Sequence, residues 1–190
     1  SLNTASGPVL CAAAIRARGG EIVLKDASDE GPVVWATGWQ GLRDLSRSFG
    51  AEIGTGVKGQ ALALRDTAPE DAPQIYAQGL HIVSHADGTV AIGSTSERDF
   101  DDPVRTDRQL DDLHERATAA LPILHGAPVT ARWAGVRPRA RTRAPLLGPW
   151  PGRPGHFVAN GGFKIGFGIA PKVADLVAGF VLDGRDDIPD

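Results

Sequence analysis

The sequence predicts an α+β protein in which an antiparallel sheet with helices is flanked by partial α/β elements. Three observations predict this fold class. The first 50 residues follow a helix–strand–turn–strand order, the middle holds hairpin strands, and the end runs from a strand through a glycine-rich loop into a helix. A middle domain inserted into another domain gives this order, because the chain leaves one domain and later returns to it. We therefore expect three segments, 1–49, 50–151 and 152–190.

The composition is that of a globular chain of 190 residues. Lys and Arg total 20, Asp and Glu total 23, and apolar residues make up 42%; this balance excludes collagen-like, coiled-coil and disordered classes. The net charge of −3 disfavours a general nucleic-acid binder. No apolar run approaches the roughly 18 residues that span a bilayer, and the single cysteine, Cys11, cannot form an internal disulfide. We expect a cytoplasmic protein.

The first elements follow from turn residues and apolar runs. Pro8 in the first turn and Gly19-Gly20 at the end predict a helix over 8–18. The runs 21–26 and 33–37 are predicted strands, and 41–48 is expected to form one or two helical turns.

The middle of the chain is predicted to be antiparallel. Strands are expected at 57–64, 74–85 and 89–95, the last two joined by a hairpin turn over 86–88 in which Gly88 supplies a positive φ. A further strand is expected over 128–136.

The clearest helix is predicted over 106–120. Thr106 or Asp107 can cap it, and Pro122 ends it. One face carries apolar residues at helical spacing: Leu110, Leu113, Ala117 and Leu121.

The C-terminal part contains the first candidate site. A rigid turn over 149–154 and a strand over 156–160 lead into the stretch NGGFKIGFGIAP, and an amphipathic helix is expected over 171–182. Glycines let the backbone approach a flat or phosphorylated ligand, and a helix N-terminus offers free N–H groups to an anion. The alternative is a tight turn that only packs the helix on the strand.

A second candidate is a run of arginines at alternate positions, Arg137, Arg139, Arg141 and Arg143. If the segment is extended, all four share one face and suit a carboxylate or phosphate. The alternative is a solvated edge that pairs with the acidic stretch 99–102. Arg137 differs, because it follows an apolar strand and a buried arginine needs an anionic partner.

Weaker signals lie elsewhere. The strand 33–37 ends in Thr37-Gly38, where nucleotides bind in open α/β sheets. His81, at the centre of a predicted strand, faces either a pocket or merely the sheet. The histidines show no HExxH pattern; His81 and His85 are four residues apart, but on a predicted strand rather than a helix. No serine lies in a nucleophile elbow, so metal and hydrolase chemistry are disfavoured.

Taken in order, these motifs resemble the C-terminal part of FAD-dependent oxidoreductases of the D-amino-acid oxidase/glycine oxidase family. The resemblance covers about residues 8–183. It rests on five motifs in register: VVWATG, VKGQALAL, HIVSHADGTVAIGSTSE, WAGVRP with the following APLLG, and NGGFKIGFGIAP.

The resemblance implies non-covalent FAD and a set of site residues. Arg137 is expected to grip the substrate carboxylate. His81, Ser96 and Lys164 stand where glycine oxidases carry Tyr, Met and Arg, and are expected near the substrate. The residues expected beside FAD are Ala36, Thr37, Gly38, Gly161, Gly162, Lys164, Ile165 and Gly166. Cys11 lies far from the region that carries a covalent flavin link in sarcosine oxidases.

The resemblance also implies the activity. An amine, expected to be an amino acid, is oxidised by hydride transfer to FAD, with segment 50–151 as the substrate (cap) domain and the flanks as parts of the FAD-binding domain. The GxGxxG fingerprint that belongs near the start of the family's chain is absent from the residues before VVWATG, and the chain holds no Met, so we expect a truncated portion that is inactive alone. Two alternatives stay open: a flavin-dependent tRNA-modification module, and a flavin-free fragment acting as an interaction domain.

Overall fold

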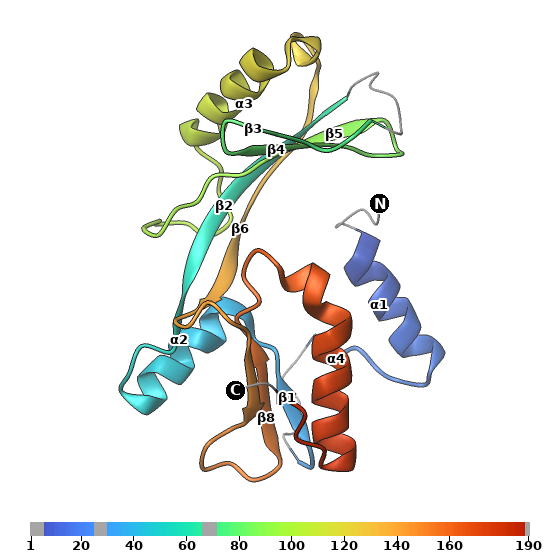
Figure 1. Cartoon of the computed structure of the whole chain (residues 1–190), viewed down its shortest axis with the longest axis vertical. Coiled ribbons are helices and arrows are strands. Elements are labelled where there is room, and N and C mark those ends of the chain that lie inside the picture. Colours follow the sequence, from blue (N-terminus) through green and yellow to red (C-terminus); the bar gives the residue numbers. More distant parts are fainter. Residues whose placement is uncertain (1–5, 25–29, 66–71, 189–190) are drawn as a thin grey trace.

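Two long strands connect the two halves of the molecule. The computed structural model describes residues 6–24, 30–65 and 72–188. β2 (Gly54–Arg65) and β6 (Val129–Ala140) pair antiparallel along their length. Figure 1 shows them running from the lower half, with α2, β1, β8 and α4, to the upper half, with β3, β4, β5 and α3.

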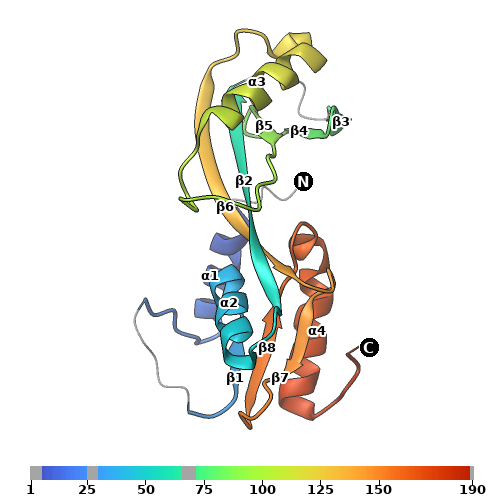
Figure 2. The ribbon, with the colours of Figure 1, turned by 90° about the vertical axis from the view of Figure 1, so that its left-hand side faces the viewer.

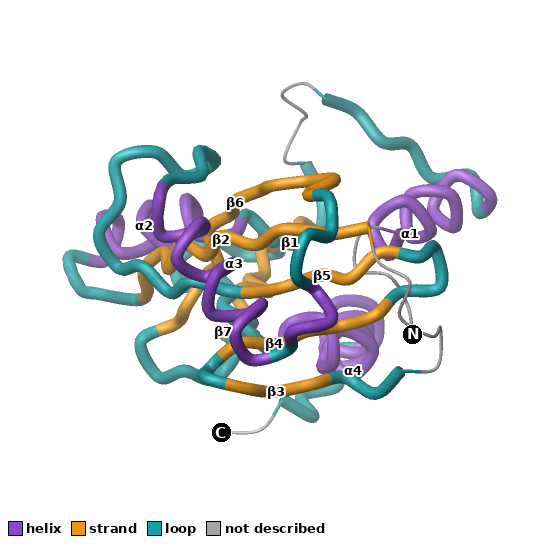
Figure 3. Tube along the Cα trace, turned by 90° about the horizontal axis from the view of Figure 1, so that it is seen from above, coloured by secondary structure: helices purple, strands orange, loops and turns teal. Residues whose placement is uncertain are grey.

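The upper half is a five-stranded sheet in the order β3-β4-β5-β2-β6, antiparallel throughout. Its remaining strands are β3 (Ile75–Ala77), β4 (Leu80–Ser84) and β5 (Thr89–Gly93). Figure 3 shows these strands side by side with α3 (Arg108–Ala120) across them. A short 3-10 helix, η1 (Pro122–Leu124), follows α3.

The main core lies between α3 and one face of this sheet. Alternate residues of the strands point to that face, as the two-residue period of a strand requires. The fully buried members include Leu62, Ile92, Leu110 and Leu113. The opposite face of the sheet therefore carries the odd-numbered residues of β2, including Gly59 and Ala61.

The lower half is a three-stranded sheet in the order β1-β8-β7. β1 (Val33–Trp35) pairs parallel with β8 (His156–Asn160), and β7 (Leu146–Pro149) pairs antiparallel with β8. Figure 2 shows α2 (Gly38–Phe49) and α4 (Gly166–Asp183) on opposite sides of this sheet. Helix α1 (Ser6–Ala17) precedes it in the chain.

The predicted fold class is confirmed, but several element boundaries were wrong. Residues 21–24 form no strand, and 25 and 26 lie outside the described residues. The predicted strand 74–85 is two strands, because Gln78 and Gly79 adopt φ of 51° and 78° and form a tight turn. Helix α4 begins at Gly166, five residues before Pro171, which lies inside it.

The turn over 86–88 and the cap of α3 were predicted correctly. Gly88 has a φ of 77° between β4 and β5. The side chain of Asp107 accepts a hydrogen bond from the backbone N–H of Gln109, so Asp107 is the N-cap. Leu110, Leu113 and Ala117 are buried as expected.

Asp107 makes a testable contribution to stability at low pH. Hydrogen bonds from the Gln60 side chain and the Gln109 backbone lower the pKa of Asp107. The ionised carboxylate is thus favoured in the folded state, so its stabilisation is present above an unfolded pKa of about 3.9 and is lost as pH falls through the lowered folded value. We expect Asp107→Asn to make thermal unfolding less dependent on pH between about pH 4 and 2, measured by circular dichroism. An unchanged pH dependence would contradict this.

Among the described residues, no helix is both long enough and apolar enough to cross a membrane.

Candidate functional site

A hollow of about 520 Å³ lies where the glycine-rich loop meets the end of β6. It brings together three stretches that are far apart in the sequence: the end of β1, the end of β6, and the loop that leads into α4. Its walls are formed by Ala36, Gly38, Arg137, Pro138, Ala159, Asn160, Gly161, Gly162, Phe163, Lys164, Gly166 and Phe167.

Backbone contacts hold the glycine-rich loop against β6. Gly162 forms a β-bridge with Arg139, and the N–H of Phe163 donates to the carbonyl of Pro138. At Gly161, whose φ is 79°, an added Cβ would lie 2.8 Å from the Cβ of Ala140. The close approach therefore requires glycine there for both space and conformation.

Asn160 connects two walls of the hollow. Its Nδ2 donates to the carbonyl of Gly38 at 2.9 Å, and its Oδ1 accepts from the N–H of Gly161 at 2.7 Å. The side chain is 8% exposed, so both of these bonds are shielded from water. They fix the end of β1 relative to the loop.

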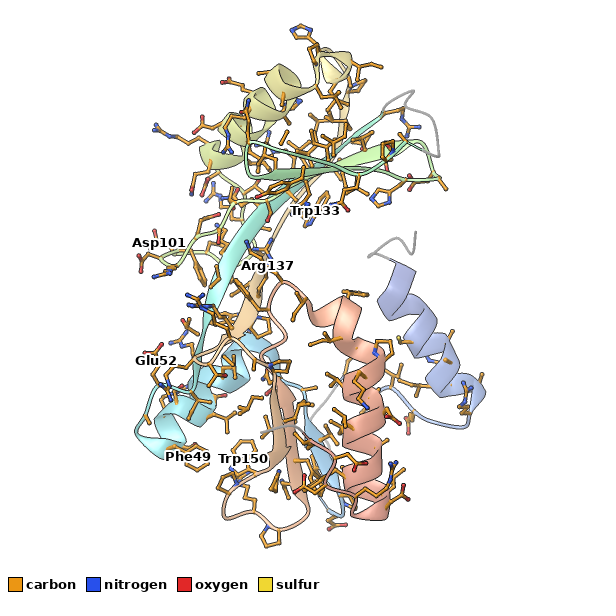
Figure 4. All side chains as sticks on the ribbon, viewed as in Figure 1. Phe49, Glu52, Asp101, Trp133, Arg137 and Trp150 are labelled. Atoms are coloured by element: carbon orange, nitrogen blue, oxygen red, sulfur yellow. The ribbon has the colours of Figure 1, made fainter. Side chains whose placement is uncertain are left out.

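Arg137 lies at the waist of the molecule, between the two halves (Figure 4). Its Nη2 donates to Ser94 Oγ at 2.6 Å, whereas its Nη1 is buried and has no hydrogen-bond partner. Burial lowers the pKa of the Arg137 guanidinium, while the charge of Glu97 raises it. The expected anionic partner is thus replaced by a hydroxyl, and one N–H pair is left for a ligand.

Gly59 gives the guanidinium its space. A Cβ on Gly59 would lie 2.0 Å from Arg137 Nη1 and 2.4 Å from Nη2. Arg137 therefore extends over the backbone of β2, on the face of the sheet opposite α3. Only glycine leaves that position open.

The four arginines do not share one face, which corrects the extended-segment hypothesis. β6 ends at Ala140, and the N–H of Arg143 donates to the Ala140 carbonyl in a turn in which Arg143 has a φ of 67°. Arg139 instead lies over the ring of Phe163, 6.0 Å from its centroid, and Lys164 Nζ is 5.7 Å from the same centroid. No ion pair among the described residues joins these arginines to 99–102.

His81 and Ser96 do not line the hollow. His81 is exposed in β4, where its Nδ1 is 2.8 Å from Gln74 Nε2 and its ring is 4.8 Å from that of Tyr76. His81 pairs with Gly93, next to Ser94, so it lies on the same sheet face as Arg137. Ser96 is exposed.

Thr37 and Ile165 also lie at the edge of the hollow rather than in its walls. Thr37 precedes α2, and Ile165 precedes α4 without giving a side-chain cap. The first N–H groups of α4 therefore have no side-chain partner at the cap, next to Gly166 and Phe167 in the wall.

Sequence reasoning missed Gly59 and Ser94 as parts of the site, and it placed Asn160 in the candidate stretch without giving its side chain a role. Gly59 and Ser94 reach Arg137 only through the pairing of β2 with β6 and β5, which spacing along the chain does not reveal. Asn160 had a signal, because a buried amide directly before Gly161-Gly162 can bind the adjacent backbone. Across the described chain, no three His, Cys, Asp or Glu gather as metal ligands.

The fold is that of an FAD-dependent oxidoreductase. The family model "DAO: FAD dependent oxidoreductase" matches residues 9–179, so the chain belongs to this family, whose cofactor is FAD.

The glycine oxidases are among its relatives. The chain is 34% identical to the glycine oxidase of Pseudomonas putida over 165 residues, covering 86% of this chain and 44% of that protein. It is 31% identical to the Pseudomonas aeruginosa glycine oxidase over 180 residues, covering 91% and 49%. The crystal structure of glycine oxidase from Geobacillus kaustophilus superposes with a TM-score of 0.73 at 29% identity, covering 83% of this chain and 43% of that chain. The chain thus spans about half the length of the relatives it matches.

Proposed function

We propose that this chain is the substrate-side and C-terminal portion of a flavin-dependent oxidoreductase that oxidises an amine, an amino acid above all, at its α-carbon. The observation that carries the proposal is Arg137, whose guanidinium lies over Gly59 with an unpartnered buried Nη1 beside the glycine-rich loop. A carboxylate is the ligand that satisfies this group, because it accepts charge-assisted hydrogen bonds from a guanidinium.

The residues of the hollow also fit a flavin. Gly161 and Gly162 contribute backbone without side chains to the wall, and Lys164 and the N-terminus of α4 add positive potential there. Ala36, Gly38, Gly161, Gly162, Lys164 and Gly166 would face the cofactor, with Thr37 and Ile165 at its edge. In this proposal 1–49 and 152–190 form the cofactor side, and 50–151 forms the substrate side.

When bound beside these residues, FAD would supply the hydride acceptor for the substrate α-C–H bond. Arg137 holds the carboxylate and so fixes the direction of the α-C–H bond, which is catalysis by orientation. No Asp, Glu or His is among the residues that line the hollow; a neutral amine needs no base there. Lys164 and the α4 N-terminus stabilise negative charge that develops nearby. The relatives named glycine oxidase favour a small amino acid as substrate.

Riboflavin is the probe that tests the cofactor part of this proposal, because the residues above are proposed to face the flavin ring. We expect the chain to quench riboflavin fluorescence saturably, and FAD to compete. Lys164→Glu should weaken the binding about fivefold, since it replaces a hydrogen-bond donor at the wall with an acceptor that cannot bond the ring carbonyl oxygens. The control is Lys172→Glu, an exposed lysine of α4 that pairs only with Asp175. Unsaturable quenching, or equal affinities of both variants, would contradict the proposal.

Gly59→Ala tests whether Arg137 binds a carboxylate. The new Cβ would force the flexible end of Arg137 to move rather than the backbone, so we expect carboxylate affinity to fall about tenfold while the free energy of unfolding changes little. Acetate titration measures the affinity. Gly135, which pairs with Gly59, is the control, because a Cβ there meets nothing within 4 Å. Equal affinities of Gly59→Ala and Gly135→Ala would contradict a site above Gly59.

A further inference from the structure

Ser94 is the only side chain that the described structure shows hydrogen-bonded to the guanidinium of Arg137. We propose that Ser94 is a positioning residue: its hydroxyl holds Nη2 of Arg137 so that Nη1 stays turned toward the ligand. This inference rests on the proposed function, and it assigns a role to a residue outside the expected site.

Backbone bonds clamp the segment that carries Ser94 onto β2. Lys58 N–H donates to the Glu97 carbonyl at 2.8 Å, and Glu97 N–H donates to the Lys58 carbonyl at 2.8 Å. Two residues earlier, Thr95 N–H donates to the Gln60 carbonyl at 3.2 Å, and Gln60 N–H donates to Thr95 Oγ1 at 2.8 Å. Ser94, directly after β5, therefore precedes a segment that is bonded to β2 on both sides of Gly59.

A buried network of side chains fixes the same segment a second time. Lys58 Nζ lies 3.6 Å from Glu97 Oε2, and both side chains are under a tenth exposed. Gln60 Nε2 and Thr95 Oγ1 donate to Glu97 Oε1. Asp107 Oδ2 lies 3.9 Å from the same lysine. Because Lys58, Gln60 and Glu97 are buried or nearly so, these contacts restrict the arrangement of the segment.

The backbone bonds and the side-chain network together explain why Arg137 Nη2 is hydrogen-bonded to Ser94 while Nη1 has no partner. Ser94 cannot follow the guanidinium if it rotates, because its segment is tied to β2 at Lys58 and Gln60. The guanidinium of Arg137 is thus oriented before a carboxylate binds. This raises the affinity, because binding no longer carries the entropic cost of ordering the arginine side chain.

Nitrogen-15 NMR of the arginine side chains of the 190-residue chain tests the inference directly. We expect slow rotation about the Nε–Cζ bond of Arg137, seen as separate Nη signals, and fast rotation with averaged signals in Ser94→Ala. Ser94→Thr keeps the hydroxyl and should restore separate signals. Acetate affinity should fall about tenfold in Ser94→Ala and recover in Ser94→Thr.

A double-mutant cycle separates positioning from a general structural effect. If Ser94 acts through Arg137, Ser94→Ala should change acetate affinity no further once Arg137→Lys is present. Ser84→Ala, a half-buried serine of β4, is the control and should leave the Arg137 signals unchanged. Separate Nη signals in Ser94→Ala, or additive losses in the cycle, would overturn the inference. An Arg137→Lys variant that keeps full acetate affinity while Ser94→Ala still frees the rotation would overturn the proposed function and leave the positioning role standing.

Discussion

Replacing Arg137 with methionine is expected, under the proposed function, to lower kcat/KM for amino-acid oxidation by at least about a hundredfold in the flavin-loaded enzyme of which this chain is the proposed portion, because a charged hydrogen-bonded anchor for the carboxylate is lost. Methionine fills the space of the stem without leaving a buried charge, so thermal unfolding should change little. Arg137→Lys should restore only part of the loss, since an ammonium cannot form two parallel hydrogen bonds to a carboxylate.

The control for this experiment is Arg132→Gln. Arg132 lies on the same strand, but it is exposed and its Nη2 pairs with Asp111 at 2.6 Å, outside the site. We expect its kcat/KM to stay within about twofold of the unmodified protein, since exposed pairs contribute little. If steady-state kinetics show Arg137→Met to be no worse than Arg132→Gln, Arg137 does not anchor the substrate.

Lys58→Met is expected to cost about 3–5 kcal/mol of unfolding free energy, measured by urea denaturation. Lys58 is 3% exposed, and removing its ammonium leaves the nearly buried carboxylate of Glu97 without its cation. The double variant Lys58→Met/Glu97→Leu should recover part of this loss, because no unpaired charge then remains buried. A loss no larger than that of Arg132→Gln would show that the pair is dispensable.

The sequence predicts most elements of the fold, and fails where the backbone conformation is unusual for the residue present. A cap at Asp107 and the helical spacing of Leu110, Leu113 and Ala117 are enough to predict α3. The sequence does not mark Gln78 and Arg143 as turn residues, because both adopt a positive φ, which is uncommon outside glycine. The sequence predicts a start of α4 at Pro171, because proline suits the first turn of a helix; in the structure it is the sixth residue of a helix that begins at Gly166, where its missing N–H removes one intrahelical bond.

The candidate site could be predicted only where its members lie in one motif. The glycine-rich loop and Arg137 each stand in a recognisable stretch, and the structure places them around one hollow. Ser94 and Gly59 contact Arg137 across strands, and Lys58 pairs with Glu97 through the fold. Partners of this kind depend on strand register, which is set by the whole sheet rather than by local residues.

The bridge between Arg139 and Gly162, together with the bond from Phe163 to Pro138, joins the loop to β6 within two residues of Arg137. The backbone position of Arg137 relative to the loop is therefore set by contacts that lie within two residues of it on β6.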